Sequence, residues 1–346
     1  MDKRYYDGTK LLSLKDINGK RPEIYICTTN RNAGKTTYFS RLLINRFIDR
    51  KEKFMIVYRY SYELKSAAEK FFSLVHNLFF PSYMMKSEKR DNGTYYELFL
   101  NGDSCGYAVA LNKADALKKV SNVFSTVRRM MFDEFQSETN TYAPEELKKL
   151  RSVHTTVARG EGEQVRYVPV YMIGNPVTIL NPYYVALGIS NRLTDQTIFL
   201  RGDGFVLEQG FNQAASDAQK ESAFNRAFSA DKYTAYASEG IYLNDNASFI
   251  EKPSGKSLYV CTLKYKGNLY AIREYRDAGI VYCDPSADPS FPVRIAVTTE
   301  DHNINFVMLK QYSALLEQLR FYFERGCFRF RNLLAKEALL TALSYK

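Results

Sequence analysis

Apolar and polar residues follow a strand–loop–helix order near the start of the chain. Residues 25–27 form an apolar, β-favouring run, and turn-forming residues come next at Asn30, Asn32 and Gly34. From Phe39 to Ile48 the apolar residues recur at helical spacing. The pattern therefore predicts a strand near 25–27, a tight loop, and a helix that begins close to Gly34.

Strand and helix patterns then alternate as far as residue 174. The turn pair Asn101-Gly102 predicts a hairpin over residues 95–111. Alternating strands and helices favour a mainly parallel sheet with helices on both faces and a ligand site at the strands' carboxyl ends. The other predicted elements are strands at 54–58 and 168–174 and helices at 62–79 and 144–156.

The second half of the chain has a different pattern. Residues 208–240 are rich in Ala, Ser and Gln and weakly apolar, which predicts a small helical linker. Because 346 residues exceed the usual size of one core, we expect more than one domain. We predict an α/β protein of three parts, residues 1–207, 208–240 and 241–346. The last has predicted strands near 257–265, 269–275 and 279–283 and helices near 306–325 and 331–344.

The loop before the first helix has the residues of a phosphate-binding loop. Backbone N–H groups of such a loop and the helix N-terminus bind the phosphates, a lysine reaches the β- and γ-phosphates, and a hydroxyl binds Mg²⁺. Thr29 stands where the usual G-x-x-x-x-G-K-[ST] pattern has glycine, so an ordinary loop before an amphipathic helix is the alternative. The predicted nucleotide-binding residues are Thr29, Asn30, Arg31, Asn32, Ala33, Gly34, Lys35, Thr36 and Thr37.

A second motif supports nucleotide hydrolysis. The apolar run 130–132 is followed by Asp133 and Glu134, about one hundred residues after the loop. We expect Asp133 and Thr36 to hold Mg²⁺ and Glu134 to orient the attacking water. Two solvated carboxylates at a strand end are the simpler alternative. Together the two motifs predict an ATPase that uses ATP and Mg²⁺.

The positive net charge fits a polyanionic partner and a merely soluble basic surface equally well, and the position of three lysines favours the partner. The formal net charge is +10, and Lys113, Lys118 and Lys119 lie in a polar segment before the acidic strand. Such lysines can contact a phosphate backbone without reading bases. A second basic and aromatic cluster, residues 320–331, is explained equally well by an amphipathic helix that uses its aromatic side chains for core.

Several classes of site are not expected. The five cysteines form no C-x-x-C pair and there are three histidines, so we expect no zinc site and reduced cysteines in a cytoplasmic protein. No apolar run reaches 18 residues, and the N-terminus lacks a signal-peptide pattern. We therefore expect no membrane partner.

Short blocks spread over nearly the whole chain resemble the DNA-packaging ATPases of phi29-type tailed phages, which are related to large terminases. The family also tolerates a non-glycine first loop position and carries an arginine inside the loop. The blocks are KLLSLKDIN, R-N-x-G-K-T, INRFI, VYRYSYEL, FDEF, GN-x5-NPYY, FIEK, YCDPSADPS, VTTED and LRFYFERGCFRF.

The resemblance implies a RecA-like, additional-strand ATPase domain, a linker domain, and a C-terminal domain similar to ribonuclease H. It also implies a homomeric ring, which we expect to be a pentamer, at the portal of an empty prohead. There ATP hydrolysis would drive double-stranded DNA inward. The protein would act in the host cytoplasm and at the portal vertex and be absent from the mature virion. A structural packaging RNA is a candidate further partner.

The resemblance also suggests roles for individual residues. Asn175 matches a position that senses the γ-phosphate, and Arg159 matches an arginine finger that acts on a neighbouring subunit's site. A length difference over 156–167 leaves Arg166 as an alternative. The segment around 118–122 matches the family's DNA grip. Arg31 could contact phosphates, switch partners or brace the loop.

The C-terminal domain resembles a nuclease that has lost its activity. A working ribonuclease H-like site has an acidic residue on its first strand, and here that strand reads SLYVCTLKY. Asp284 and Asp288 remain, but turn formation explains them equally well. We expect a motor without nuclease activity. The alternatives are a nuclease-competent terminase or a helicase, and a non-hydrolysing DNA-binding scaffold.

Overall fold

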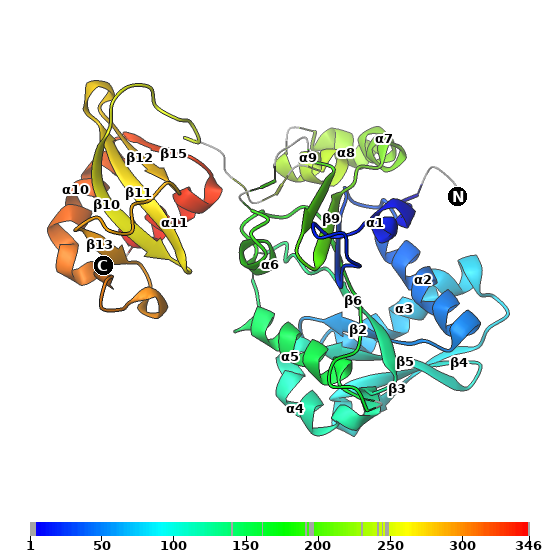
Figure 1. The fold of residues 1–346 in the computed structure, drawn as a ribbon. Helices are drawn as coiled ribbons and strands as arrows, with labels where there is room; N and C mark the ends of the chain where they lie inside the picture. Colours follow the sequence, from blue (N-terminus) through cyan, green and yellow to red (C-terminus); the bar gives the residue numbers. More distant parts are fainter. Residues whose placement is uncertain are drawn as a thin grey trace. The chain divides into compact units, whose positions relative to one another are not determined.

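The chain forms two compact units in the computed structural model, which describes residues 5–139, 141–160, 162–190, 192–193, 197–229, 231–240, 242–243, 245 and 249–344. One unit comprises residues 1–189 and 193–244, and the other residues 190–192 and 245–346 (Figure 1). Residues 208–240, the predicted linker, belong to the first unit. Ile241, where we predicted the last domain to begin, lies outside the described residues.

Within its described residues, the first unit is built on a nine-stranded sheet of order β3-β4-β5-β2-β6-β7-β1-β9-β8. Its six central strands run parallel, and the edge pairs β3–β4, β4–β5 and β8–β9 are antiparallel. The strands are β1 Ile24–Thr28, β2 Lys53–Tyr58, β3 Met85–Arg90, β4 Tyr95–Leu100, β5 Asp103–Ala110, β6 Val127–Asp133, β7 Val170–Gly174, β8 Phe199–Gly202 and β9 Phe205–Gln209.

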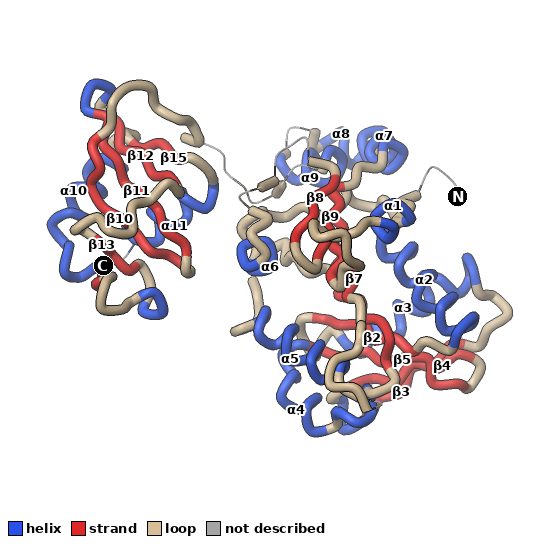
Figure 2. The backbone as a smooth tube through the Cα atoms, in the orientation of Figure 1, coloured by secondary structure: helices blue, strands red, loops and turns tan. Residues whose placement is uncertain are grey.

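Helices cover both faces of this sheet (Figure 2). Successive residues of β2 point to opposite faces, so Phe54 and Ile56 pack in one core while Met55 and Val57 pack in the other. The first core includes α2 and α3, and the second includes α4 and α5. The helices are α1 Thr9–Ser13, α2 Lys35–Arg50, α3 Leu64–Phe79, α4 Ala114–Lys119, α5 Glu146–Ala158, α6 Pro182–Ala186, α7 Gln213–Glu221, α8 Ala223–Ala227 and α9 Lys232–Glu239.

The predicted α/β class is confirmed. The hairpin β4–β5 turns at Asn101 and Gly102, whose φ angles of 49° and 85° suit these two residue types. Strand β3 was not predicted, because its sequence MKSEKR has no apolar alternation and an edge strand needs none.

Within its described residues, the second unit has a six-stranded sheet of order β14-β13-β10-β11-β12-β15. The predicted helix 306–325 is wrong at its start, because Val307 and Met308 pair with β13. The predicted helix 331–344 is confirmed as α11. The elements are β10 Leu258–Tyr265, β11 Asn268–Tyr275, β12 Ile280–Asp284, β13 Arg294–Ala296, β14 Val307–Met308, α10 Ser313–Glu324, β15 Phe328–Phe330 and α11 Leu333–Ser344.

In the part of the chain that the structure describes, no helix is both long and apolar enough to cross a membrane.

Candidate active site

The loop between β1 and α2 has the backbone that anion binding requires. Asn32 and Gly34 adopt left-handed conformations, with φ of 61° and 91°, and α2 begins at Lys35 directly after Gly34. These turns aim the amide groups at the helix N-terminus toward one point. Thr29 has no positive φ, so its position does not require glycine. Asn32, rather than Thr29, takes the left-handed conformation that favours glycine or asparagine.

Lys35 lies inside the loop rather than in solvent. Its Nζ donates to Thr29 Oγ1 and to Asn175 Oδ1, each at 2.9 Å. Burial lowers the pKa of the Lys35 ammonium. A third, longer bond of 3.4 Å goes to Thr29 O, so the ammonium lies in the cradle and is held by neutral oxygens that an incoming phosphate can replace.

Strand order brings the two sequence motifs together. Strand β7 lies between β1 and β6, so the ends of all three strands meet beside the loop. The Thr36 hydroxyl donates to Asp133 Oδ1 at 3.4 Å, and Asn175 follows the end of β7. Burial and the nearby Glu134 carboxylate raise the pKa of Asp133 to about 6. Two cations, the Lys35 ammonium and a Mg²⁺ ion, would favour the ionised carboxylate there.

A hydroxyl and a carboxylate oxygen are suitable Mg²⁺ ligands, because this ion prefers oxygen and keeps several waters or phosphate oxygens in its shell. Thr36 and Asp133 would supply those two ligands. The residues thus fit the metal that the sequence predicts.

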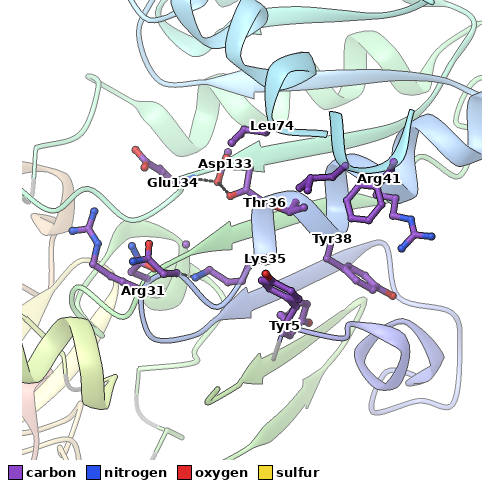
Figure 3. Close-up of a pocket in the computed structure, with 17 residues that line it drawn as sticks. Tyr5, Arg31, Lys35, Thr36, Tyr38, Arg41, Leu74, Asp133 and Glu134 are labelled. Atoms are coloured by element: carbon purple, nitrogen blue, oxygen red, sulfur yellow. Dashed lines mark hydrogen bonds between the residues drawn. The ribbon is translucent and has the colours of Figure 1, made fainter. Parts of the chain in front are cut away.

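Glu134 projects from an unusual backbone conformation at the end of β6. Its φ is 53°, and its amide donates to Asp133 Oδ1 at 3.0 Å. The side chain is exposed and lines the same pocket as Lys35 (Figure 3). Glu134, the predicted water-orienting residue, thus lines the same pocket as the predicted phosphate-binding and Mg²⁺-binding residues.

The pocket also has apolar and aromatic lining residues, which the sequence analysis missed. It measures about 710 Å³, within the range of small-molecule sites. The Tyr6 amide donates to Ala33 O at 2.7 Å, which holds the N-terminal segment against the loop. In the sequence, the only indication of these lining residues near the N-terminus was the aromatic pair Tyr5-Tyr6, which is far from any motif. The apolar and aromatic lining residues are Tyr5, Tyr38, Leu74, Leu78 and Phe79, and Arg41 lies over the Phe79 ring. In Figure 3, Leu74 lies beside Asp133, and Tyr5 and Tyr38 lie on the other side of Thr36.

Arg31 points away from the centre of the cradle. It donates to Glu138 Oε1 at 2.7 Å and to the Tyr233 hydroxyl, and its amide donates to Ala237 O. Asn30 is fully buried, and its side chain donates to Asn212 O at 3.0 Å. The α7–α9 segment therefore contacts the phosphate-binding loop directly.

Comparison with known proteins identifies the family. Residues 1–342 match the podovirus DNA encapsidation protein (Gp16) family. The chain belongs to this family. It is 27% identical over 337 residues to the DNA packaging protein of Bacillus phage phi29, covering 96% of this chain and 95% of that protein. It is 26% identical over 310 residues to the DNA packaging protein of Bacillus phage B103, covering 88% and 92%.

Solved structures show the same fold. A chain of the bacteriophage phi29 viral genome packaging motor assembly matches with a TM-score of 0.70 and 24% identity, over 98% of this chain and 99% of that one. A chain of the phi28 DNA packaging motor matches with a TM-score of 0.63 and 15% identity, over 100% and 99%. The resemblance to phi29-type packaging ATPases is thus confirmed.

The structure separates the two candidate finger arginines of this encapsidation protein. Arg159 caps the C-terminal end of α5 and is exposed. Arg166 is only 3% exposed, and its guanidinium donates to Val157 O at 2.6 Å and Val127 O at 3.3 Å. Arg166 thus binds carbonyl groups of its own core, whereas Arg159 is exposed. Arg159 is the remaining candidate.

The three candidate DNA-binding lysines lie around α4. All are exposed, and Lys118 pairs with Asp115 at 3.0 Å.

The two candidate nuclease carboxylates have partners within the protein. Arg273 Nε donates to Asp284 Oδ2 at 2.9 Å, and the Ser286 amide donates to Asp284 Oδ1. Asp288 Oδ1 accepts from the amide and hydroxyl of Ser290. An arginine thus neutralises Asp284, and Asp288 closes a turn.

Proposed function

We propose that this encapsidation protein is an ATP-driven motor that moves double-stranded viral DNA into a preformed prohead. The observation that carries the proposal is the meeting of Lys35, Thr36, Asp133 and Asn175 at one end of the sheet, in a chain of this family. Those residues suit a nucleoside triphosphate, and the family's name supports DNA packaging as the purpose of hydrolysis.

In this proposal each group of the site has one task in hydrolysis. Lys35 moves from Thr29 and Asn175 to the β- and γ-phosphates, and Asn175 is then free to sense the γ-phosphate. Bound Mg²⁺ would neutralise developing phosphate charge, held by Thr36 and Asp133. Glu134 orients and polarises the water. The aromatic lining at Tyr5 and Tyr38 would take the base, with Tyr5 as the exposed aromatic surface.

The coupling between subunits would use Arg159. An exposed arginine at a helix end suits a finger that reaches a neighbour's nucleotide, where it stabilises transition-state charge. We expect a homomeric ring, a pentamer by family resemblance, attached to the portal in the host cytoplasm, with a packaging RNA as a candidate additional partner. The phi29 relative's occurrence in a genome packaging motor assembly supports this arrangement.

DNA would contact the exposed lysines Lys113, Lys118 and Lys119. Contacts to phosphates alone give sequence-independent, salt-sensitive binding, which a translocating motor needs because it must release and rebind every sequence.

We propose that the C-terminal unit is ribonuclease H-like and expect no nuclease activity from it. The ion pair between Arg273 and Asp284 supports this expectation, because the carboxylate that a metal ion would need as a ligand is already paired with an arginine. The second candidate function is a nuclease-competent terminase, which the ion pair disfavours, and the third is a non-hydrolysing DNA-binding scaffold.

Lys35→Ala tests the proposal. The substitution should abolish DNA-stimulated ATP hydrolysis, because it removes the charge that binds the phosphates, while circular dichroism should show a folded protein. Unchanged ATPase activity would contradict the proposed site. Incubation of the unmodified protein with plasmid and Mg²⁺ or Mn²⁺ distinguishes the second candidate, since cleavage that is lost in Asp284→Ala would reveal a nuclease.

A further inference from the structure

Beside the nucleotide pocket, one ion pair is almost completely buried. Arg59, which directly follows β2, donates from Nε to Glu146 Oε2 at 2.8 Å, and the two side chains are 8% and 1% exposed. A buried ion pair requires good geometry and further hydrogen bonds to offset its desolvation. The Arg59–Glu146 pair has good geometry, and both side chains make further hydrogen bonds. Those of Arg59 reach the turn that carries Glu134.

The free end of the guanidinium holds the turn that carries Glu134. Arg59 Nη2 donates to Glu134 O at 3.2 Å and to Phe135 O at 2.8 Å. Glu134 adopts a left-handed backbone, which is unfavourable for a residue with a Cβ and persists only where its surroundings impose it. One amino group of Arg59 thus binds both carbonyl groups of the strained turn.

Glu146 has two further hydrogen-bond partners besides Arg59. Its Oε2 also accepts from the Ala143 amide at 2.8 Å, and its Oε1 accepts from the Tyr183 hydroxyl at 2.8 Å. Glu146 is the first residue of α5, and Arg159 caps that helix at its other end. A helix of this length spans about 20 Å as a stiff unit. The ion pair therefore joins the turn of Glu134 to the helix that carries Arg159.

The backbone of Arg59 makes a third connection. Its carbonyl accepts from the Asn112 amide at 3.3 Å, and Asn112 Oδ1 accepts from the Ser61 amide at 3.0 Å. Asn112 directly precedes Lys113, the first of the exposed lysines proposed to contact DNA. The residues after β2 thus contact the turn at Glu134, the start of α5 and the segment that precedes Lys113.

We propose that Arg59 and Glu146 are positioning residues that hold Glu134 in its working conformation and couple it to α5. The inference rests on the proposed hydrolysis at this site and assigns the pair no contact with the nucleotide. Arg59 and Glu146 would act on the chemical step rather than on nucleotide binding, because their bonds reach Glu134 and not Lys35.

The test compares Arg59→Lys and Glu146→Gln with Arg129→Lys. A lysine keeps the charge but cannot bind the carboxylate and both carbonyl groups at once. Arg129 is a matched control, because its Nε pairs with Glu52 at 2.8 Å and its Nη1 donates to Tyr171 at 2.7 Å. It lies on β6, the strand that ends at Asp133.

The expected result is a separation of kcat from binding. Arg59→Lys and Glu146→Gln should each lower kcat for ATP at least tenfold, with KM and the Kd for a fluorescent ATP analogue changing less than threefold. Arg129→Lys should lower the unfolding temperature without that loss of kcat. Expressing kcat per nucleotide-binding subunit keeps unfolded protein out of the comparison.

Two outcomes would overturn the inference. One is a normal kcat in both Arg59→Lys and Glu146→Gln, and the other is an equal loss of kcat in Arg129→Lys. Lys35→Ala is measured in parallel. If Lys35→Ala retains ATPase activity, the proposed function itself has failed, whereas loss in Lys35→Ala with normal kcat in the Arg59 and Glu146 variants refutes only the positioning role.

Discussion

At the residue scale, the backbone conformation of Thr29 and of Glu134 differs from what the sequence around each residue suggests. Thr29 looks like a defect in the loop pattern, yet its φ is not positive and its hydroxyl binds Lys35. Glu134 looks like an ordinary strand-end carboxylate, yet it has a φ of 53°. A strained residue at a site whose surroundings hold it in place suggests a requirement of function rather than of folding.

Glu134→Gln should uncouple binding from hydrolysis. The amide keeps the shape and hydrogen-bonding reach of the side chain but cannot accept a proton from water, so kcat should fall by about 10² to 10⁴. Binding of a fluorescent ATP analogue should persist, because Lys35 and Thr36 are intact. Steady-state ATPase assays and equilibrium titration measure the two quantities, and normal turnover would exclude Glu134 as the water-orienting group.

At the scale of elements, α5 shows how one helix serves several purposes. The sequence suggests that Glu145 and Glu146 favour the helix N-terminus through the dipole. In the structure Glu145 lies before the helix with φ 52°, and Glu146 turns inward to Arg59. Further along the same helix, His154 Nε2 lies 3.0 Å from Val168 O and 3.5 Å from Glu23 Oε1.

The His154 contact predicts a pH-dependent contribution to stability. Burial alone would lower the pKa of His154, but the hydrogen bond and charge of Glu23 and the Val168 carbonyl raise it overall. A raised pKa in the folded state stabilises the protein below the unfolded value of about 6.5, and the effect disappears as pH rises through the folded pKa. The pKa of Glu23 is lowered in the folded state. Its contribution to folding stability is therefore present above the unfolded pKa of about 4.3 and is lost as the pH falls.

Unfolding in urea at pH 6 and pH 8.5 tests this contribution. His154→Gln should destabilise the protein more at pH 6, by about 0.5–1 kcal/mol, since both side chains remain partly solvated. Glu23→Gln should remove the same pH-dependent difference. An equal effect of His154→Gln at both pH values would show that the ion pair contributes nothing.

At the scale of the whole molecule, the described pocket is lined without Arg159. If Arg159 is the proposed finger, it would serve a neighbour's site, and a closed ring of identical subunits would give every site such a neighbour. The proposed motor is therefore complete only as an oligomer.

Mixing two inactive variants tests the trans arrangement. Arg159→Ala should lose a factor of about 10³ to 10⁵ in kcat, and Lys35→Ala should lose nucleotide binding. In mixed rings, an Arg159→Ala subunit can use the intact arginine of a Lys35→Ala neighbour. An equal mixture should regain about a quarter of unmodified ATPase activity if subunits assemble randomly in a head-to-tail ring. No recovery in rings shown to be mixed by pull-down would exclude a trans role.

The sequence by itself determined the local units. The strand, loop and helix from β1 into α2 are contiguous, so turn residues and apolar spacing predict them without tertiary information. The acidic pair at the end of β6 was recognisable for the same reason. The pattern also determined the α/β class, because strands buried on both faces are apolar throughout.

Only the tertiary structure decided which distant residues meet. Strand order brought Asn175 between the loop and Asp133, and packing buried Arg166 while leaving Arg159 exposed. The contact of α9 with Arg31 and the ion pair of Arg59 with Glu146 join residues far apart in the chain. No periodic pattern encodes such pairings, because a charged side chain has the same sequence signature whether it faces solvent or a buried partner.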